Sequence, residues 1–507
     1  MNTARSVSTL GIVGAGLMGQ GIAQIAALGG VNVLLFDTRT SAAADAIDLI
    51  GAMLTRLVEK GRLTESERAA ALTRLRPVAN LGGVADCDAV VEAIVEDLDA
   101  KRVLMRELES VVADNCILAT NTSSLSVTAI AAACARPDRV AGFHFFSPVP
   151  LMKVVEVIDG ARTDAAVSEC LVELARRMGH APVRAQDTPG FIVNHAGRAY
   201  VTEGLRILGE GVTDAATLDR VLRDAAGFRM GPCELLDLTG LDVSHPVMTS
   251  IYDQYFQEPR YRPSPMTRQR LAAGLLGRKS GQGFYTYVNG VARIPPECAA
   301  PSSRPARVFV AAADPAVRAN LIALVRRLGG VLDEGERPAD DALCVVAPAW
   351  GEDATTACLA HALEPLRTIA IDLFSDETRR RTLMRTPLTD PARCDEAHGL
   401  FATDGVPVSV IRDSTGFITQ RVLAMIVNLG CDIAQQRIAS PGDIDTAVQL
   451  GLGYPAGPLA LGDRLGPQRV LDILDRIETF TRDPRYRPSP WLIRRARLGV
   501  SLLTPDA

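Results

Sequence analysis

One histidine lies in an apolar stretch that could position it for proton transfer. Residues 142–158 read GFHFFSPVPLMKVVEVI, with His144 before a Pro-x-Pro break and Glu156 in the strand-like run after it. An imidazole accepts and releases protons near neutral pH, and a carboxylate behind it fixes the tautomer and stabilises the protonated ring. The stretch therefore predicts a proton-transfer pair, and a buried histidine with a purely structural role is the alternative.

The first 40 residues predict a dinucleotide site. The segment TLGIVGAGLMGQGIAQIAALGGVNVLLFD reads as strand, glycine turn, helix and second strand. Gly14 permits the tight turn, Gly16 lets the backbone approach a pyrophosphate, and Gly19 lets helix and strand pack closely. The helix amino terminus that follows offers unpaired N–H groups to the phosphates.

An acid at the end of the second strand indicates which dinucleotide is bound. Asp37 follows Gly19 by 18 residues, where a carboxylate accepts hydrogen bonds from the adenosine ribose and repels a 2′-phosphate. NAD is therefore favoured over NADP, and the nearby Arg39 could soften that preference. Leu17 and Met18 complete the predicted cofactor-binding turn.

The elements that hold these residues read as one sheet. Strand-like runs at residues 88–97 and 116–126 alternate with helical patterns, which is typical of a parallel, doubly wound sheet. Ligands of such sheets bind beyond the carboxyl ends of the strands. Glu96, Ser123 and His144 each lie at or just past such an end, so we expect the three side chains to converge on one edge.

The second half of the chain repeats the first. Asp187 and Asp219 recur at a constant offset as Asp413 and Asp445, and PRYRPSP occurs twice. Repetition of this kind indicates duplication. Residues 289–412 also read as α/β, but at residues 310–314 VAAAD replaces a glycine turn. The β-carbons there and the charge of Asp314 would keep phosphate away.

The predicted fold class is an α/β Rossmann sheet with an all-α domain, followed by a degenerate Rossmann-like domain and a second all-α domain. The expected boundaries are 1–186 for the NAD-binding domain, 187–288 for the first helical domain, 289–412 for the degenerate domain without a nucleotide site, and 413–507 for the helical duplicate.

Composition narrows the class of protein further. The 507 residues carry a net charge of −5 without a block of like charge, which argues against nucleic-acid or anionic-membrane partners. No apolar run reaches the roughly 18 residues of a membrane span. Ten scattered cysteines, none in a C-x-x-C pair, fit reduced thiols in a cytoplasmic protein better than disulfides or a metal site.

Six ordered motifs resemble the L-3-hydroxyacyl-CoA dehydrogenase family over nearly the whole chain. They are GIVGAGLMGQGIA, VEAIVED, NTSSLS, HFFSPVPLMKVVEV, DTPGFIVN and GRKSGQGFY. The chain looks most like the long bacterial form with two C-terminal domains, which acts on 3-hydroxyadipyl-CoA or 3-hydroxybutyryl-CoA in phenylacetate catabolism. The resemblance implies reversible, NAD-dependent oxidation of (S)-3-hydroxyacyl-CoA to 3-oxoacyl-CoA, also a step of fatty-acid catabolism.

The resemblance also implies a role for each matching residue. His144 would be the catalytic base with Glu156 as its partner, and Ser123 and Asn194 would contact the substrate. Lys60 matches a position that contacts coenzyme A phosphate, with a solvated lysine as the alternative. The implied NAD contacts are Asp37, Glu96, Lys101, Ser123, Ser147 and Lys279.

One position departs from the family pattern. The family reads His-Phe-Phe-Asn, whereas this chain has Ser147 as the fourth residue. Serine keeps a hydroxyl but lacks the amide donor and its reach. We expect activity to be retained with weaker ordering of the bound thioester. A catalytically weakened NAD-binding protein of the same fold is the alternative.

Two further alternatives concern enzyme class and assembly. The 6-phosphogluconate-like hydroxyacid dehydrogenases join a similar sheet to a helical domain but use a lysine on the linking helix, and GFIVNHAGRAYVTEGL contains none. In short relatives of the resembled family, helical domains pair to form a dimer. Here we expect the two helical copies to pair within one chain, with a homodimer of whole chains as a further alternative.

Overall fold

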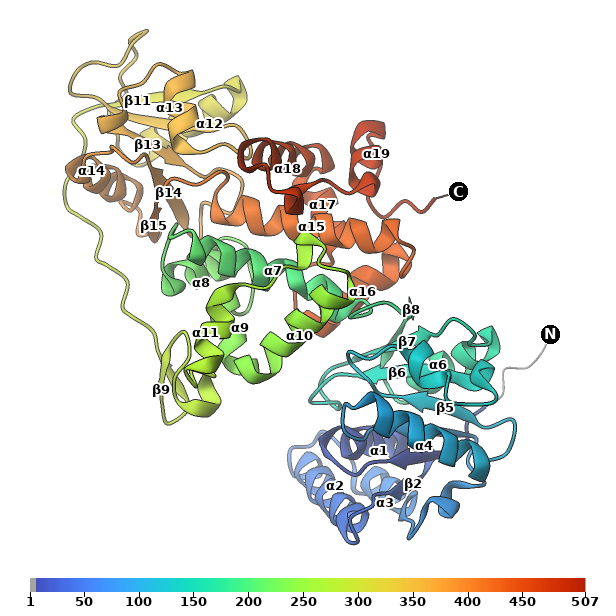
Figure 1. Cartoon of the computed structure of the whole chain (residues 1–507). Coiled ribbons are helices and arrows are strands. Elements are labelled where there is room, and N and C mark those ends of the chain that lie inside the picture. Colours follow the sequence, from blue (N-terminus) through green and yellow to red (C-terminus); the bar gives the residue numbers. More distant parts are fainter. Residues whose placement is uncertain (1–5, 507) are drawn as a thin grey trace. The chain divides into compact units, whose positions relative to one another are not determined.

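The computed structural model describes residues 6–506 (Figure 1). The chain forms two compact units. The first unit contains the amino-terminal residues up to Ala196 together with Ile433–Gly457, and the second contains Gly197–Asp432 and Pro458–Thr504. Each unit is therefore built from segments far apart in the sequence.

The first unit contains an eight-stranded sheet in the order β3-β2-β1-β4-β5-β6-β7-β8. Its strands are β1 (Thr9–Val13), β2 (Asn32–Phe36), β3 (Leu75–Pro77), β4 (Ala89–Glu92), β5 (Ile117–Thr120), β6 (Val140–Phe145), β7 (Val154–Asp159) and β8 (Ala181–Gln186). Its helices before the last strand are α1 (Leu17–Leu28), α2 (Ala42–Glu59), α3 (Glu65–Thr73), α4 (Leu98–Val111), α5 (Val127–Ala131) and α6 (Ala165–Arg177).

Apolar side chains cover both faces of this sheet. Ile12 and Val91 belong to the core cluster that contains residues of α1, α2 and α6, whereas their neighbours Val13 and Val90 belong to a separate cluster with α4. Successive strand residues point to opposite faces, so a strand buried on both faces reads as a continuous apolar run. The predicted Rossmann class is confirmed.

One detail of the predicted sheet is wrong. The sequence predicts parallel strands throughout, but β7 runs antiparallel to β6. The link at residues 146–153 is shorter than the dozen or so residues that a parallel crossover needs. A short connection therefore forces the chain to turn back beside β6.

The second unit contains helices and a smaller sheet. After the linking helix α7 (Val193–Gly209), its first helical group is α8 (Ala215–Asp224), α9 (Pro232–Thr239), α10 (Leu241–Gln254) and α11 (Pro265–Ala272), followed by the hairpin β9 (Thr286–Val288) and β10 (Val291–Arg293). An extended segment, visible in yellow-green in Figure 1, leads from this hairpin to the next sheet.

The smaller sheet has five strands in the order β11-β12-β13-β14-β15, and β14 runs antiparallel to β13. Its elements are β11 (Val308–Ala312), α12 (Pro315–Arg327), β12 (Leu343–Ala347), α13 (Ala354–Ala360), β13 (Thr368–Ile371), β14 (Arg381–Arg385), α14 (Pro391–Phe401) and β15 (Val408–Ile411). The last helices of the chain are α15 (Ile418–Gln435), α16 (Pro441–Leu452), α17 (Pro458–Leu465), α18 (Pro467–Thr481) and α19 (Pro490–Leu498). Of these, α16 belongs to the first unit.

The repeated residues make the same contacts in both halves. Asp187 accepts hydrogen bonds from the first amides of α5, and Asp413 accepts them from the first amides of α13. A β-carbon on Gly231 would overlap Asp219, and one on Gly457 would overlap Asp445. Residues at matching positions therefore have the same structural roles in the two halves.

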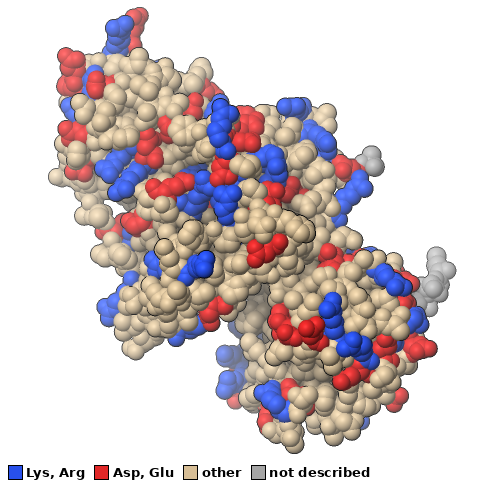
Figure 2. Space-filling model, viewed as in Figure 1, with Lys and Arg blue, Asp and Glu red and all other residues tan. Residues whose placement is uncertain are grey.

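Charges are mixed over the molecular face in Figure 2, with basic and acidic side chains interspersed. Among the described residues, no helix has the length and apolar character needed to cross a bilayer. Within residues 6–506, no group of three or more His, Cys, Asp or Glu side chains is arranged to hold a metal ion.

Candidate active site

The antiparallel pairing of β6 and β7 brings the predicted proton-transfer pair together. His144 lies directly opposite Glu156 in the strand register, and opposite residues project from the same face of a sheet. The Nδ1 atom of His144 is 2.6 Å from Oε2 of Glu156, and both side chains are buried. The short turn between β6 and β7 thus places His144 opposite Glu156.

The second oxygen of Glu156 is held by backbone amides at the start of α7. Oε1 accepts hydrogen bonds from the N–H groups of Ile192 and Val193, each at 2.9 Å. An ionised carboxylate only accepts hydrogen bonds, so with Glu156 ionised the Nδ1 atom of His144 is the donor within the pair. The Nε2 atom is then the unprotonated nitrogen available to act as a base.

Two aromatic rings flank the imidazole. The ring centroids of Phe146 and Phe191 lie 4.3 Å and 5.8 Å from that of His144. Phe191 has a φ angle of 48°, in the left-handed region that non-glycine residues seldom occupy. Such strain is concentrated at functional sites. Sequence reasoning missed Phe191, although its place after the Pro-Gly of DTPGFIVN was a signal of an unusual turn.

Ser123 and Asn194 meet beside this pair. Asn194 follows Val193 in α7, and its Nδ2 donates to the backbone oxygen of Ser123 at 3.3 Å. The backbone N–H of Ser123 donates to Oε1 of Glu96 at 2.8 Å, and its hydroxyl donates to the same oxygen at 3.2 Å. The loop after β5 and the start of α7 are therefore joined where the sequence predicted substrate contacts.

Glu96 organises the loop that contains Ser123. Burial acts to raise the pKa of Glu96, but the charge of Lys101 and hydrogen bonds from Thr122, Ser123 and Ser124 outweigh it, so the pKa is lowered. Glu96 is therefore ionised at neutral pH and holds the loop as an acceptor.

Lys101 is buried between two carboxylates. Its side chain is only 1% exposed, and its Nζ lies 2.6 Å from Glu92 and 3.3 Å from Glu96. A buried ammonium between two carboxylates acts on its surroundings through those carboxylates. The predicted contact of Lys101 with NAD stays a prediction.

The glycine turn leaves room for a phosphate. Gly14 has a φ angle of 107°, and a β-carbon on it would lie 2.5 Å from a backbone oxygen, whereas a β-carbon on Gly19 would overlap the backbone of Gly14. A β-carbon on Gly16 would meet only open space, and Gly16 caps α1 without a side-chain hydrogen bond. The amino end of α1 is thus open to an anionic group.

The glycine turn and the matching turn of the smaller sheet differ in what lies at the start of the helix that follows. Leu17 is 71% exposed and Met18 is half-buried beside the open amides. In the smaller sheet, Asp314 accepts hydrogen bonds from the N–H groups of Ala316 and Val317 at the start of α12. A carboxylate occupies there the place that a phosphate would take.

Asp37 lies beside the glycine turn. Its Oδ2 accepts a hydrogen bond from the N–H of Ala15 at 2.8 Å, and its Oδ1 accepts from Nε of Arg39 at 3.0 Å. The Arg39 guanidinium is the main cause that lowers the pKa of Asp37 to about 2. Asp37 is therefore negatively charged throughout the physiological pH range.

Replacing Asp37 by Ser should change the dinucleotide preference. Each hydrogen bond from a ribose hydroxyl to a charged acceptor stabilises by about 1.5–3 kcal/mol, so KM for NADH should rise at least about tenfold. Loss of the negative charge frees Arg39 for a 2′-phosphate, so kcat/KM for NADPH should increase. The check is the ratio of kcat/KM values for NADH and NADPH. Asp99→Ser, at a side chain 90% exposed in the same unit, is the control, and an unchanged ratio in Asp37→Ser would remove Asp37 from the site.

Three other predicted residues make no described contact with the imidazole pair. Ser147 is exposed just beyond β6, and Lys60 is exposed at the end of α2. Lys279 belongs to the second unit, where its Nζ lies 2.9 Å from Asp242. Their predicted contacts with NAD and coenzyme A stay predictions.

The smaller sheet has its own counterpart of the imidazole position, which sequence reasoning missed. TIAIDLFS aligns with VAGFHFFS, so Asp372 matches His144, and it follows β13 beside β14 as His144 lies in β6 beside β7. Asp372 accepts hydrogen bonds from Thr419 and Gln420, and burial raises its pKa. The shared Phe-Ser ending of the two segments was the signal. A carboxylate enclosed by donors cannot replace the imidazole pair.

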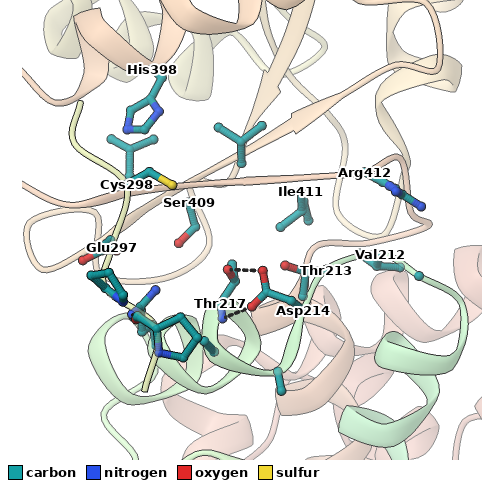
Figure 3. Close-up of a pocket in the computed structure, with 18 of the residues that line it drawn as sticks. Val212, Thr213, Asp214, Thr217, Glu297, Cys298, His398, Ser409, Ile411 and Arg412 are labelled. Carbon is teal, nitrogen blue, oxygen red and sulfur yellow. Dashed lines mark hydrogen bonds between the residues drawn. The ribbon is translucent and has the colours of Figure 1, made fainter. Parts of the chain in front are cut away.

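One large cavity is lined by residues of the second unit alone. Its volume is about 1080 Å³, and it lies in the second unit between α8, the segment at residues 293–298 and β15 (Figure 3). Thr213, Cys298 and Ser409 line it, and His398 lies at one end. None of the sequence-predicted site residues lines this cavity.

A buried imidazole–carboxylate pair and an open glycine turn on one Rossmann sheet define a dinucleotide-dependent dehydrogenase. Residues 9–188 match the model of the 3-hydroxyacyl-CoA dehydrogenase NAD-binding domain, and residues 190–287 and 416–501 match that of the 3-hydroxyacyl-CoA dehydrogenase C-terminal domain. The chain belongs to the 3-hydroxyacyl-CoA dehydrogenase family.

Relatives support this assignment over the full length. The chain is 38% identical to the 3-hydroxyadipyl-CoA dehydrogenase of Escherichia coli across 97% of this chain and 98% of that protein. A crystal structure of 3-hydroxybutyryl-CoA dehydrogenase from Escherichia coli is similar with a TM-score of 0.85 and 37% identity, covering 97% of this chain and 99% of that one. A probable 3-hydroxybutyryl-CoA dehydrogenase of Deinococcus radiodurans is 40% identical but covers 55% of this chain and 99% of its own length.

Proposed function

We propose that the protein catalyses the reversible, NAD-dependent oxidation of (S)-3-hydroxyacyl-CoA to 3-oxoacyl-CoA. The observation that carries the proposal is the His144–Glu156 contact of 2.6 Å, with both oxygens of Glu156 occupied by donors and Nε2 of His144 left as the base. The open turn at Gly16 and the charged Asp37 lie on the same sheet and fit NAD.

The chain's own residues supply proton transfer and orientation. The Nε2 atom of His144 takes the proton from the C3 hydroxyl, and Glu156 stabilises the imidazolium that forms. When bound, NAD accepts the hydride from C3. The amides of Ile192 and Val193 keep the charge of Glu156 in place. In the reverse direction the imidazolium returns the proton to the substrate oxygen.

Other residues bind the two ligands in this proposal. Ser123 and the amide of Asn194 contact substrate oxygens, and Lys60 pairs with a phosphate of coenzyme A. The turn that contains Gly14, Gly16, Leu17, Met18 and Gly19 would hold the phosphates of NAD. The remaining proposed NAD contacts are Asp37, Glu96, Lys101, Ser123, Ser147 and Lys279.

The two helical repeats pair within one chain in this proposal and replace the partner subunit of shorter relatives. Two backbone hydrogen bonds support it, because the N–H of Gln186 donates to Ile438 and, at the matching repeat positions, the N–H of Arg412 donates to Val212. Reciprocal contacts are typical of a two-fold interface. The four-domain division at 1–186, 187–288, 289–412 and 413–507 belongs to the same proposal.

The proposal also includes a cytoplasmic setting. Ten free thiols support a cytoplasmic location, since unpaired cysteines persist in reducing compartments. The substrate class is a 3-hydroxyacyl thioester of fatty-acid or phenylacetate catabolism, and the names of the relatives point to 3-hydroxyadipyl-CoA and 3-hydroxybutyryl-CoA.

The direct test is NADH-dependent reduction of 3-oxoacyl thioesters. We expect acetoacetyl-CoA or 3-oxoadipyl-CoA to be reduced with kcat/KM of about 10⁴–10⁸ M⁻¹s⁻¹, and the better of the two identifies the acyl group. Acetoacetyl-N-acetylcysteamine, which lacks the nucleotide part of coenzyme A, is the matched control and should react with lower kcat/KM. NADH binding without turnover of any 3-oxoacyl-CoA would instead indicate the catalytically weakened alternative.

A further inference from the structure

Helix α16 of the second helical repeat lies behind the imidazole pair. It packs against β7, which contains Glu156, and against β8, the edge strand of the eight-stranded sheet. The segment before it is fixed by the hydrogen bond of 2.8 Å from the N–H of Gln186 to the oxygen of Ile438. A helix about 300 residues away in sequence thus supports the strand with the catalytic carboxylate.

The contact is closest at Gly451. A β-carbon on this residue would lie 2.9 Å from Cγ2 of Val193 and 3.5 Å from Cγ1 of Val154. Val193 is 2% exposed, so its side chain has little space into which it can move. The first distance is shorter than real carbon contacts allow, and a larger residue at 451 would displace Val193.

The backbone of Val193 connects this contact to the chemistry. Its N–H is one of the two donors to Oε1 of Glu156, and the other oxygen of Glu156 holds Nδ1 of His144. A shift of Val193 would therefore move an amide that fixes the carboxylate, which in turn orients the imidazole. Interactions behind a catalytic group control its orientation in this way.

We propose that Gly451 is a positioning residue, through which α16 of the second repeat holds the His144–Glu156 pair in its active geometry. The proposal rests on the proposed function and deepens it. It also gives the duplicated half a role, because the smaller sheet has Asp372 instead of an imidazole while the repeat attached to it contributes α16.

Gly451→Val should lower the rate of chemistry more than substrate binding. A misplacement of about 1 Å can cost about 100-fold, so we expect kcat for acetoacetyl-CoA reduction to fall about 10- to 100-fold. KM should stay within about twofold, because the base acts in the transition state and not in ground-state binding. Gly451→Ala, which adds the β-carbon alone, should give a smaller loss of the same kind.

A second substitution separates positioning from general damage. Val193→Ala removes the methyl groups that the new side chain would meet, so the double variant Gly451→Val/Val193→Ala should regain most of kcat. Gly442→Val adds the same side chain to the first turn of α16, where a β-carbon meets nothing within 4 Å, and should leave kcat unchanged.

Hydrogen–deuterium exchange gives a readout that needs no turnover. Exchange of the peptide containing the Ile192 and Val193 amides should be faster in Gly451→Val than in the parent and return towards the parent in the double variant. Parental kcat and exchange in Gly451→Val would overturn the inference, as would an equal loss in Gly442→Val or no recovery in the double variant. Failure of the proposed function appears separately, as NADH binding by the parent without turnover of any 3-oxoacyl-CoA.

Discussion

Replacing His144 by Gln lowers kcat for acetoacetyl-CoA reduction by about 10²- to 10⁴-fold, the usual contribution of general acid–base catalysis. Gln is close to His in length and can still hydrogen-bond to Glu156, but its amide cannot carry a proton between the substrate and the protein. The loss therefore reports chemistry and not collapse of the packing around β6 and β7.

Two controls check this result. They are NADH binding by His144→Gln and the kcat of a variant at a histidine outside the site. NADH binding, followed by its fluorescence, should be unchanged, because the open turn at Gly16 follows β1 whereas His144 lies in β6. His361→Gln replaces a half-buried histidine at the end of α13 in the other unit and should keep parental kcat. Activity of His144→Gln within a few-fold of the parent would mean that another group moves the proton.

The parts of the site that depend on neighbouring residues could be predicted from sequence. The glycine turn and Asp37 form one strand–helix–strand unit, so their spacing is enough to place them. The pairing of His144 and Glu156 follows from the short Pro-x-Pro link, although the predicted parallel sheet would have set the two strands in the wrong direction.

The parts that depend on distant segments could not be predicted. Nothing in the sequence around Ser123 indicates that Asn194 donates to its backbone. The burial of Lys101 between Glu92 and Glu96 depends on side-chain packing that periodicity does not describe. The contact of Gly451 with Val193 joins the two repeats, and only the three-dimensional structure reveals it.

The second large effect concerns a buried ion cluster between the two helical repeats. Glu203 of α7 is fully buried and accepts hydrogen bonds of 2.8 Å from Nε of Arg421 and from the hydroxyl of Tyr486. Arg485 lies 3.5 Å from its other oxygen. Burial acts to raise the pKa of Glu203, but Arg421 and Arg485 outweigh it and the pKa is lowered. Glu203 thus stays charged, and Arg421, Arg485 and Tyr486 all belong to the second repeat.

Arg421→Met should reduce the free energy of unfolding of the second unit by about 3–5 kcal/mol, because it leaves a buried carboxylate without its main counter-ion. The double variant Glu203→Met/Arg421→Met removes both charges and should recover much of the loss. Both tryptophans, Trp350 and Trp491, lie in the second unit, so urea unfolding followed by tryptophan fluorescence reports this unit.

Two further measurements distinguish this buried cluster from an exposed ion pair. They are the pH dependence of the free energy of unfolding and the cost of breaking a surface pair. A carboxylate with a lowered pKa in the folded state stabilises above its unfolded pKa, and this contribution is lost as the pH falls through the folded value. Parent and Arg421→Met should therefore converge in stability at acid pH. Arg326→Met breaks an exposed pair, 62% and 77% exposed, and should cost less than about 1 kcal/mol. If Arg421→Met costs no more than Arg326→Met, the buried cluster does not hold the two repeats together.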